Sequence, residues 1–130
     1  MDAISNALSG LRAASNRITG IASNIANAGD LGAPTPTSAG DTAYQPIDTV
    51  QLSTSSGGAD TSYRPSSPAT RPAYSPDSSV ADASGMVAAP AVDMTQQTLD
   101  LMDAREAYKA NVKTMQAADQ MQRSLLDVFA

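Results

Sequence analysis

The stretch SNRITGIASNIANAG, Ser15 to Gly29, combines a helical apolar pattern with residues that favour helices poorly. Ile18, Ile21 and Ile25 recur at spacings of three and four, which place them on one face of a helix. Serine, asparagine, threonine and glycine fill the positions between them, and these residues have low helix propensity. Because such a helix depends on tertiary burial, the stretch raises the question of what covers its apolar face.

The apolar pattern extends from this stretch back to the beginning of the chain. One series at a period of seven contains Ile4, Leu11, Ile18 and Ile25, and a second contains Met1, Leu8, Ser15 and Ala22. Two such series are typical of the a and d positions of a helical seam. They predict a helix from about residue 3 to residue 27, ended by Asn27 and Gly29.

Small residues flank the isoleucine face and allow close approach of neighbouring backbones. We interpret the apolar face as covered by the C-terminal helix, and the small flanks as facing other subunits. These flanking residues are Ala3, Ala7, Ala14, Ser15, Ala22 and Ala26.

A second helix is predicted at the C-terminal end, from about residue 93 to residue 129. Asp93 is a suitable N-cap, and Glu106 and Lys109 form an i,i+3 ion pair. Apolar residues follow at helical spacings and trace one face. These are Leu101, Tyr108, Val112, Met115, Ala118, Met121, Leu125 and Phe129.

The middle of the chain differs in composition, since all 8 prolines lie between Pro34 and Pro90. Proline disrupts helix interiors, so long helices are confined to the two ends. Residues 47–52 alternate in polarity, Gly57 and Gly58 mark a turn, and residues 59–63 return as a second strand. The remainder of the middle is predicted to be loop.

Together these patterns predict a mainly α fold. Long N- and C-terminal helices pack as an antiparallel coiled-coil hairpin, with a small irregular β-hairpin and loop segment between them. The corresponding divisions are residues 1–28, 29–91 and 92–130.

Composition excludes several functional classes. The net charge of −5 disfavours binding to nucleic acid, and no apolar run is long enough to span a membrane. Because cysteine and histidine are absent, the commonest metal ligands and general base are missing. The acidic residues Asp100, Asp103 and Glu106 are expected on a solvated or intersubunit face. We therefore predict no enzyme activity, no cofactor, no metal and no cleaved signal peptide.

Two motifs near the chain ends resemble a known family. Residues 23–28, SNIANA, resemble the signature of flagellar axial proteins, and residues 107–112, AYKANV, resemble a segment of their terminal helix. Residues 74–94 are similar to a run in the FlgC family of proximal rod proteins, although Ser79 and Met86 replace a proline and a tyrosine of that run.

The resemblance implies a structural subunit of the flagellar basal-body proximal rod. Such subunits are exported by the flagellar type III apparatus and assemble in the periplasm into a helical tube, which transmits torque and surrounds the export channel. Their terminal helices form an inner coiled-coil layer. The implied partners are further copies of the chain, other rod proteins, the rod adapter next to the membrane ring and, transiently, the export apparatus.

The polar motif residues Ser23, Asn24, Asn27 and Asn111 have two interpretations. They either cap helix ends or fix the register of helices between subunits. Alternatives for the whole chain are another short axial subunit, a secreted helical-hairpin interaction protein and, with least support, an enzyme.

Overall fold

A computed structural model of the chain describes residues 3–55 and 57–129. The elements follow one another as α1 (Ala3–Ala26), a short 3-10 helix η1 (Ala39–Asp41), β1 (Ile47–Ser53), β2 (Ala59–Pro65), β3 (Thr70–Tyr74), β4 (Met86–Pro90) and α2 (Met94–Phe129). Met1 of the second heptad series, and the ends of the predicted divisions at residues 1 and 130, lie outside the described residues. The three-part division itself stays a prediction.

The chain divides into two compact units, the first assembled from three separate segments and the second from two. Unit 1 comprises Met1–Thr19, Thr49–Ser62 and Leu99–Ala130, and unit 2 comprises Gly20–Asp48 and Tyr63–Thr98. Segments distant in sequence therefore meet within each unit.

Both predicted terminal helices are confirmed to within one residue at each end. The Oδ1 atom of Asp93 accepts hydrogen bonds from the amides of Thr95 at 2.9 Å and Gln96 at 3.1 Å, so Asp93 is the predicted N-cap of α2. With 36 residues, α2 is about 54 Å long at 1.5 Å per residue.

The predicted hairpin is also confirmed, as the two-stranded sheet of β1 and β2. Gly57 and Gly58 have φ angles of 84° and 99°, which glycine adopts at little cost. The amide of Gly57 donates to the carbonyl of Thr54, whose own amide donates to the carbonyl of Gly58. These bonds close the turn where the sequence predicts it.

A second sheet, formed by β3 and β4, lies in a region that was predicted to be loop. The strands are antiparallel, with Arg71 opposite Ala89 and Ala73 opposite Val87. Gly32 pairs with Ala88 on the other side of β4, with hydrogen bonds of 2.9 and 2.8 Å between their backbones. Val87 is fully buried, so this sheet contributes to the interior of unit 2.

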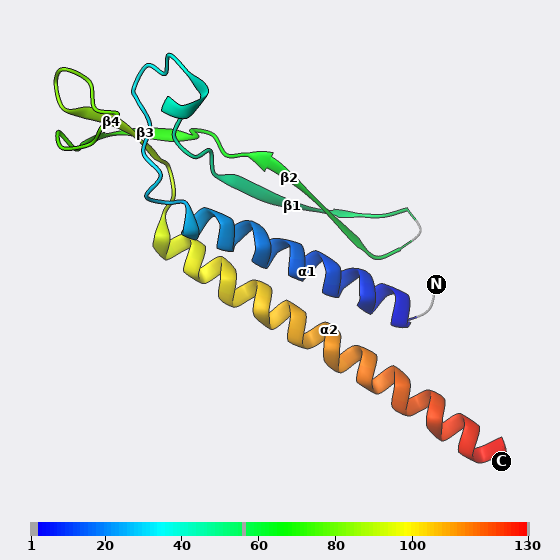
Figure 1. Ribbon diagram of the computed structural model, residues 1–130. Helices are drawn as coiled ribbons and strands as arrows, with labels where there is room; N and C mark the ends of the chain where they lie inside the picture. Colours follow the sequence, from blue (N-terminus) through cyan, green and yellow to red (C-terminus); the bar gives the residue numbers. More distant parts are fainter. Residues whose placement is uncertain (1–2, 56, 130) are drawn as a thin grey trace. The chain divides into compact units, whose positions relative to one another are not determined.

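The predicted coiled-coil hairpin is wrong, since residues 3–55 and 57–129 form a small α+β fold with two α-helices and two antiparallel two-stranded sheets. In unit 1, the β1–β2 hairpin lies along α1 on one side, and α2 runs antiparallel to α1 on another (Figure 1). Polar contacts attach the hairpin. The Oγ atom of Ser9 accepts from the amide of Ala59 at 3.1 Å, and Asn16 Nδ2 donates to Thr61 Oγ1 at 2.7 Å. Ser9 and Asn16 of α1 thus bind a sheet rather than another helix.

Small residues also form much of the interior of unit 1. Ala7, Ala13, Ala14, Ala104 and Ala118 are all buried, with exposed fractions of 6% or less. Ala7 and Ala14 were interpreted as facing other subunits, and that interpretation is wrong because a single chain already covers them. Alanine fits these positions because it allows the helix backbones to approach closely.

Candidate assembly surfaces

Asn24 is the centre of a buried hydrogen-bond network in unit 2. Its exposed fraction is 3%. Its Oδ1 atom accepts from the amide of Ile47 at 2.9 Å and from the hydroxyl of Tyr44 at 3.1 Å. Its Nδ2 atom donates to the carbonyl of Ile47 at 2.9 Å and to Gln97 Oε1 at 3.1 Å. Asn24 therefore joins the last turn of α1 to the start of β1 and the first turn of α2.

The neighbouring motif residues complete this network. The hydroxyls of Ser23 and Tyr44 lie 3.0 Å apart. Because Tyr44 has one hydroxyl proton and donates it to Asn24, Ser23 is the donor of this bond. Asn27 Nδ2 donates to the carbonyl of Ser23 at 2.9 Å and so binds a backbone carbonyl in the last turn of α1. The motif holds the end of α1 against segments far along the chain.

Asn111 marks a close approach of α1 and α2 in unit 1. Its Nδ2 atom donates to the carbonyl of Ala107 at 2.8 Å. A β-carbon added to Gly10 would lie 2.5 Å from Asn111 Oδ1 and 2.8 Å from its Cγ, so the absence of a side chain at Gly10 leaves space for the amide. Gly10, which lowers helix propensity, therefore has a packing role.

Three consecutive residues of α1 point in three directions, because each residue of a helix is rotated by about 100° from the last. Ser9 contacts the β1–β2 hairpin and Gly10 contacts α2. Leu11 is rotated by about 200° from Ser9, so it lies on the face away from the hairpin.

The predicted packing residues fall into three classes of burial. Ile21 is buried, with an exposed fraction of 7%. Seven are half-buried, namely Ile4, Leu11, Ile18, Ile25, Leu101, Val112 and Met115. Four are exposed, with fractions of 38% for Leu8, 42% for Tyr108, 60% for Met121 and 60% for Leu125. Contact of these residues with neighbouring subunits stays a prediction.

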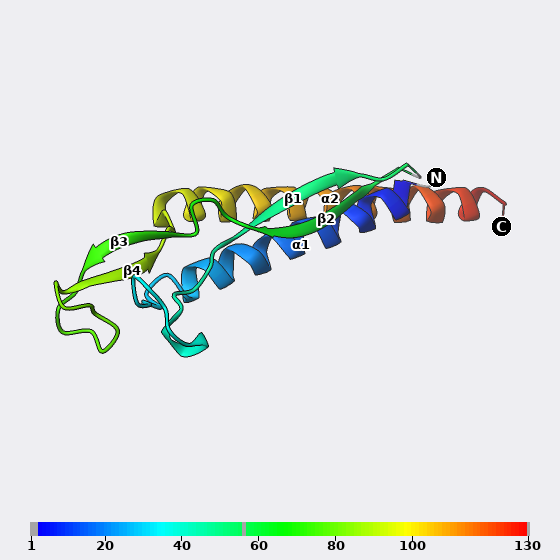
Figure 2. The same ribbon diagram turned by 90° about the horizontal axis from the view of Figure 1, so that it is seen from above.

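The C-terminal part of α2 is uncovered. In unit 1, α1 and α2 are antiparallel (Figures 1 and 2). Since Gly10 faces Asn111, a step of seven residues along each helix brings Ala3 opposite Ala118. Ala118 is buried, whereas every residue from 119 to 127 is exposed. We call residues 119–127 the α2 tail. A shallow apolar depression in it is lined by Ala117, Gln120, Met121, Ser124 and Leu125. The side chain of Phe129, a predicted member of the apolar face, lies outside the described part.

The acidic residues of α2 form surface ion pairs. Lys109 Nζ lies 2.7 Å from Glu106 Oε1, which is the ion pair that the sequence predicts. Arg123 Nε lies 3.0 Å from Asp119 Oδ2. The hydrogen bond and the charge of Lys109, with smaller effects of Lys113 and Arg105, hold the pKa of Glu106 below its ordinary value. Within residues 3–55 and 57–129, no three acidic side chains converge on a potential metal site.

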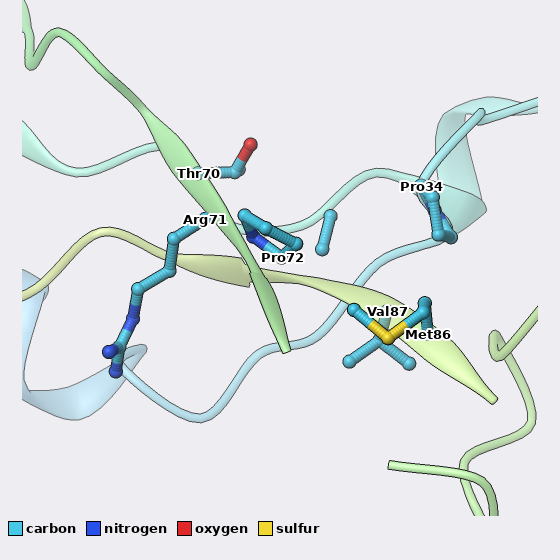
Figure 3. A pocket seen from close by; sticks show the side chains of 7 residues that line it. Pro34, Thr70, Arg71, Pro72, Met86 and Val87 are labelled. Atoms are coloured by element: carbon cyan, nitrogen blue, oxygen red, sulfur yellow. The ribbon is translucent and has the colours of Figure 1, made fainter. Parts of the chain in front are cut away.

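A pocket beside the β3–β4 sheet has a mixed lining (Figure 3). Val87 and Met86 of β4, Pro72 of β3 and Pro34 supply apolar walls, and the guanidinium of Arg71 points away from Met86 and Val87. No nucleophile and base are paired in this lining. The pocket therefore offers no arrangement for covalent catalysis.

Comparison with known families gives a match at the C-terminal end of the chain. Residues 83–128 match the family described as flagellar basal body rod FlgEFG protein C-terminal. The match supports a protein of the flagellar basal-body rod family. It covers β4, the Asp93 cap and nearly all of α2, including the Asn111 contact. None of the curated proteins compared with the chain matches it.

The match also supports a structural role in the basal-body rod and a location there. Neither helix of the described part is long and apolar enough to cross a bilayer.

Sequence reasoning missed three residues of these surfaces. Tyr44, Gln97 and Gly10 were not singled out by any of the patterns described above. Tyr44 and Gln97 lie 20 and 73 residues from Asn24, so no local spacing connects them. The signal at Gly10 was its position one residue before Leu11 in a regular heptad series.

Proposed function

We propose that this chain is a structural subunit of the proximal flagellar rod, of the FlgC type. The match of residues 83–128 to a rod protein family is the observation that carries the proposal. The match supports the rod as the destination. The chain's motifs at residues 23–28, 74–94 and 107–112 support the proximal subunit in particular.

In this role the chain polymerises into a helical tube that surrounds the export channel and transmits torque. A subunit of such a tube needs surfaces for neighbouring subunits and does not need a reactive site. The exposed residues Leu8, Tyr108, Met121 and Leu125 provide apolar surface of this kind on both helices. The proposed role is accordingly non-enzymatic and requires no cofactor.

The proposed partners are other rod proteins, the rod adapter next to the membrane ring and further copies of this chain. Before assembly the chain passes through the type III export apparatus, and it then occupies the periplasmic part of the basal body. Passage in an unfolded form is compatible with a fold stabilised largely by alanine packing and hydrogen bonds, which has few large buried side chains.

Co-assembly with rod subunits tests this proposal. The purified chain is mixed with candidate rod proteins, and polymers are measured by sedimentation and negative-stain electron microscopy. We expect the chain to enter tubular polymers in a fixed ratio to its partners. If the rod proteins assemble with one another and exclude this chain, the proposal is wrong.

Hydrogen exchange provides a second test on the same sample. We expect the amides of both helices to exchange rapidly in the dilute monomer, especially near their free ends, and to become protected in the assembly. Equal protection before and after assembly would contradict a role for the helices in subunit contacts.

Another short axial subunit is the second candidate. The description of the matched family names the flagellar basal body rod and FlgEFG proteins, which favours this alternative over a general interaction protein. Binding to the rod adapter distinguishes the candidates, because we expect a proximal subunit to bind it directly and a more distal subunit to require intermediate rod proteins.

A further inference from the structure

We infer that β1 pairs antiparallel with β1 of a second copy of this chain, so that two hairpins join into one continuous sheet. The contact uses the middle of the chain and neither of its long helices, and it does not depend on the proposed function. The observation behind it concerns strand edges. Within the described residues, the outer edge of β1 is open, whereas those of β2, β3 and β4 are closed by side chains, prolines or another segment.

Two backbone hydrogen bonds fix the register of β1 and β2. The amide of Thr54 donates to the carbonyl of Gly58 at 3.2 Å, and the amide of Ser66 donates to the carbonyl of Pro46 at 2.8 Å. The same number of residues separates Pro46 from Thr54 as separates Gly58 from Ser66, so no bulge interrupts the hairpin. Even-numbered residues therefore bond across the hairpin, and odd-numbered residues direct their backbone N–H and C=O groups outward.

Contacts of the odd-numbered residues agree with this register and show which edges are closed. The amide and the carbonyl of Ile47 both bond to the side chain of Asn24, which takes the place of a neighbouring strand at the start of β1. On β2, the amide of Ala59 donates to the hydroxyl of Ser9 at 3.1 Å. The amide of Thr61 donates to the carboxylate of the preceding residue at 2.8 Å. The edge of β2 is thus engaged within the chain at these positions.

The second sheet has both of its edges closed. On β4, Ala88 bonds to the backbone of Gly32. The amide of Met86, the next outward residue, donates to the carboxylate of Asp82 at 3.0 Å. On β3, Pro72 lies opposite Ala88 and therefore also occupies an outward position. A proline there leaves no donor for a further strand, which is a common protection of sheet edges.

The edge of β1 beyond Ile47 is the exception. Thr49, Gln51 and Ser53 direct their backbone groups outward, and within residues 3–55 and 57–129 these outward groups have no hydrogen-bond partner. Residues 49–53 contain neither proline nor a charged side chain, the two features that most often protect an edge. The segment therefore offers a site for strand pairing, and the site lies entirely within unit 1.

A second copy fits this edge because residues 49–53 are self-complementary. In an antiparallel register centred on Gln51, Thr49 of each copy lies opposite Ser53 of the other, so each outward residue meets another outward residue. A shift of two residues in one direction would pair Ser53 with Ile47, which is already engaged. A shift in the other direction would pair Thr49 with Ser55, beyond the end of β1. Only the centred register uses the whole open edge.

The side chains of the same register also match. Val50 of each copy lies opposite Leu52 of the other, and apolar cross-strand pairs of this kind stabilise sheets. In the single chain Leu52 is 52% exposed and Val50 is half-buried. The other face of the hairpin carries Thr61, which bonds to Asn16 of α1, so the apolar pairs form on the side away from α1. Because the segment is uncharged, no like charges meet at this edge, although each copy has a net charge of −5.

The contact is two-fold and therefore closed. Both copies use the same residues, so a dimer satisfies both open edges and leaves none for a third copy. A two-stranded hairpin is marginally stable, and pairing makes it part of a larger sheet. The dimer is thus a form of the free chain that protects an open edge, and it is distinct from contacts that extend a polymer.

Two substitutions test the pairing, each with a matched control. Gln51→Pro removes an outward N–H and leaves the bonds across the hairpin in place. Its control is Thr70→Pro, which changes an outward residue on the edge that Pro72 already closes. Leu52→Lys places a charge in the apolar pair, and its control, Leu99→Lys, changes a side chain of α2 with the same exposed fraction of 52%. Circular dichroism and urea unfolding establish that each variant is folded.

Analytical ultracentrifugation over a range of concentrations measures the dissociation constant of the dimer. We expect the parent to show a monomer–dimer equilibrium. Gln51→Pro and Leu52→Lys should each weaken it by roughly 10-fold or more, and each control should change it by less than about 3-fold. If Gln51→Pro does not fold, Leu52→Lys and its control decide the result.

Amide hydrogen exchange measured by NMR reports the register directly. In dilute solution we expect the amides of Thr49, Gln51 and Ser53 to exchange rapidly, and to become protected as the concentration rises. The amides of Val50 and Leu52 bond across the hairpin, so they should be protected at both concentrations. This alternation is not expected from a dimer formed through another surface.

Three outcomes would overturn the inference. The first is a parent that stays monomeric at its highest soluble concentration. The second is a dimer that Gln51→Pro and Leu52→Lys leave as tight as in the parent. The third is protection of the outward amides only after other rod proteins are added, because the occupant of the edge would then be a different chain. Co-assembly of the parent with rod proteins is measured separately and tests the proposed function alone.

Discussion

Replacing Asn24 with alanine removes four hydrogen bonds from one buried position in unit 2. The lost bonds involve the backbone amide and carbonyl of Ile47, the hydroxyl of Tyr44 and the amide of Gln97. A typical hydrogen bond contributes about 1 kcal/mol net, and a buried group left without a partner costs about 1–3 kcal/mol. Tyr44 keeps its bond with Ser23, and half-buried groups regain some water. We therefore expect a loss of about 3 kcal/mol in the free energy of unfolding.

Urea unfolding followed by circular dichroism measures this loss, and a thermal scan should show a midpoint lower by roughly 10 °C for a chain of this size. The matched control is Asn27→Ala, three residues further along the chain and one residue past the end of α1. Asn27 donates one hydrogen bond to the carbonyl of Ser23, so its replacement should cost about 1 kcal/mol or less. If Asn24→Ala destabilises no more than Asn27→Ala, the network does not join α1 to β1 and α2 as described.

Three further predictions concern other contacts. Gly10→Ala should destabilise the parent because its β-carbon would meet the side-chain amide of Asn111. In an Asn111→Ala background the same change should stabilise the chain by up to about 1 kcal/mol, because alanine has the higher helix propensity. Urea unfolding of all four chains checks this change of sign, and the same sign in both backgrounds would refute the contact. Asp93→Ala should cost about 1 kcal/mol through loss of the α2 cap and raise amide exchange in the first turn, while an unchanged exchange rate there would contradict the cap. The hydrogen bond from the side chain of Ser84, and then those from the amides of Met86 and Ser84, hold the pKa of Asp82 below its ordinary value of 3.8. The ionised carboxylate of Asp82 is thus the form that accepts these hydrogen bonds. Its contribution to the stability of the fold is complete above about pH 4 and is lost as the pH falls through the lowered pKa. NMR should show the amide of Met86 losing protection from exchange in that pH range in the parent but not in Asp82→Asn.

The helices and the first hairpin could be predicted because their signals are local. Heptad spacing, the exclusion of proline from both ends, and the Gly57-Gly58 turn each act over a few residues. The β3–β4 sheet was missed because β3 contains Pro72 and β4 ends at Pro90, and proline argues against a strand. Both prolines are accommodated because the sheet has only two strands. No further strand pairs with β3, so none needs the backbone N–H that Pro72 lacks.

The buried face of α1 was misjudged for a different reason. Sequence reasoning gave most weight to isoleucine and leucine, because large apolar side chains contribute most to burial. In unit 1 a close approach of the two helices instead involves Gly10 and Asn111, and the buried side chains include Ala7 and Ala14. The heptad series predicted the helix correctly, and the partner of its apolar face stays a prediction.

The motif asparagines illustrate the limit of spacing as evidence. Asn24 was recognised as a motif residue, yet its role depends on Tyr44, Ile47 and Gln97, whose positions are fixed only by the folded chain. Asn27 has a local partner, and its helix-end hydrogen bond was among the interpretations drawn from the sequence.

The three directions taken by Ser9, Gly10 and Leu11 also constrain how such a chain can change its length. Deleting one residue between Ala3 and Ser9 would turn everything before the deletion by about 100° relative to the rest of α1. Ile4 would then leave the side on which Leu11 lies. Insertions and deletions in α1 should therefore be tolerated only when the number of residues added or removed is close to a whole number of helical turns. The loop between β3 and β4 can vary in length without such a rule.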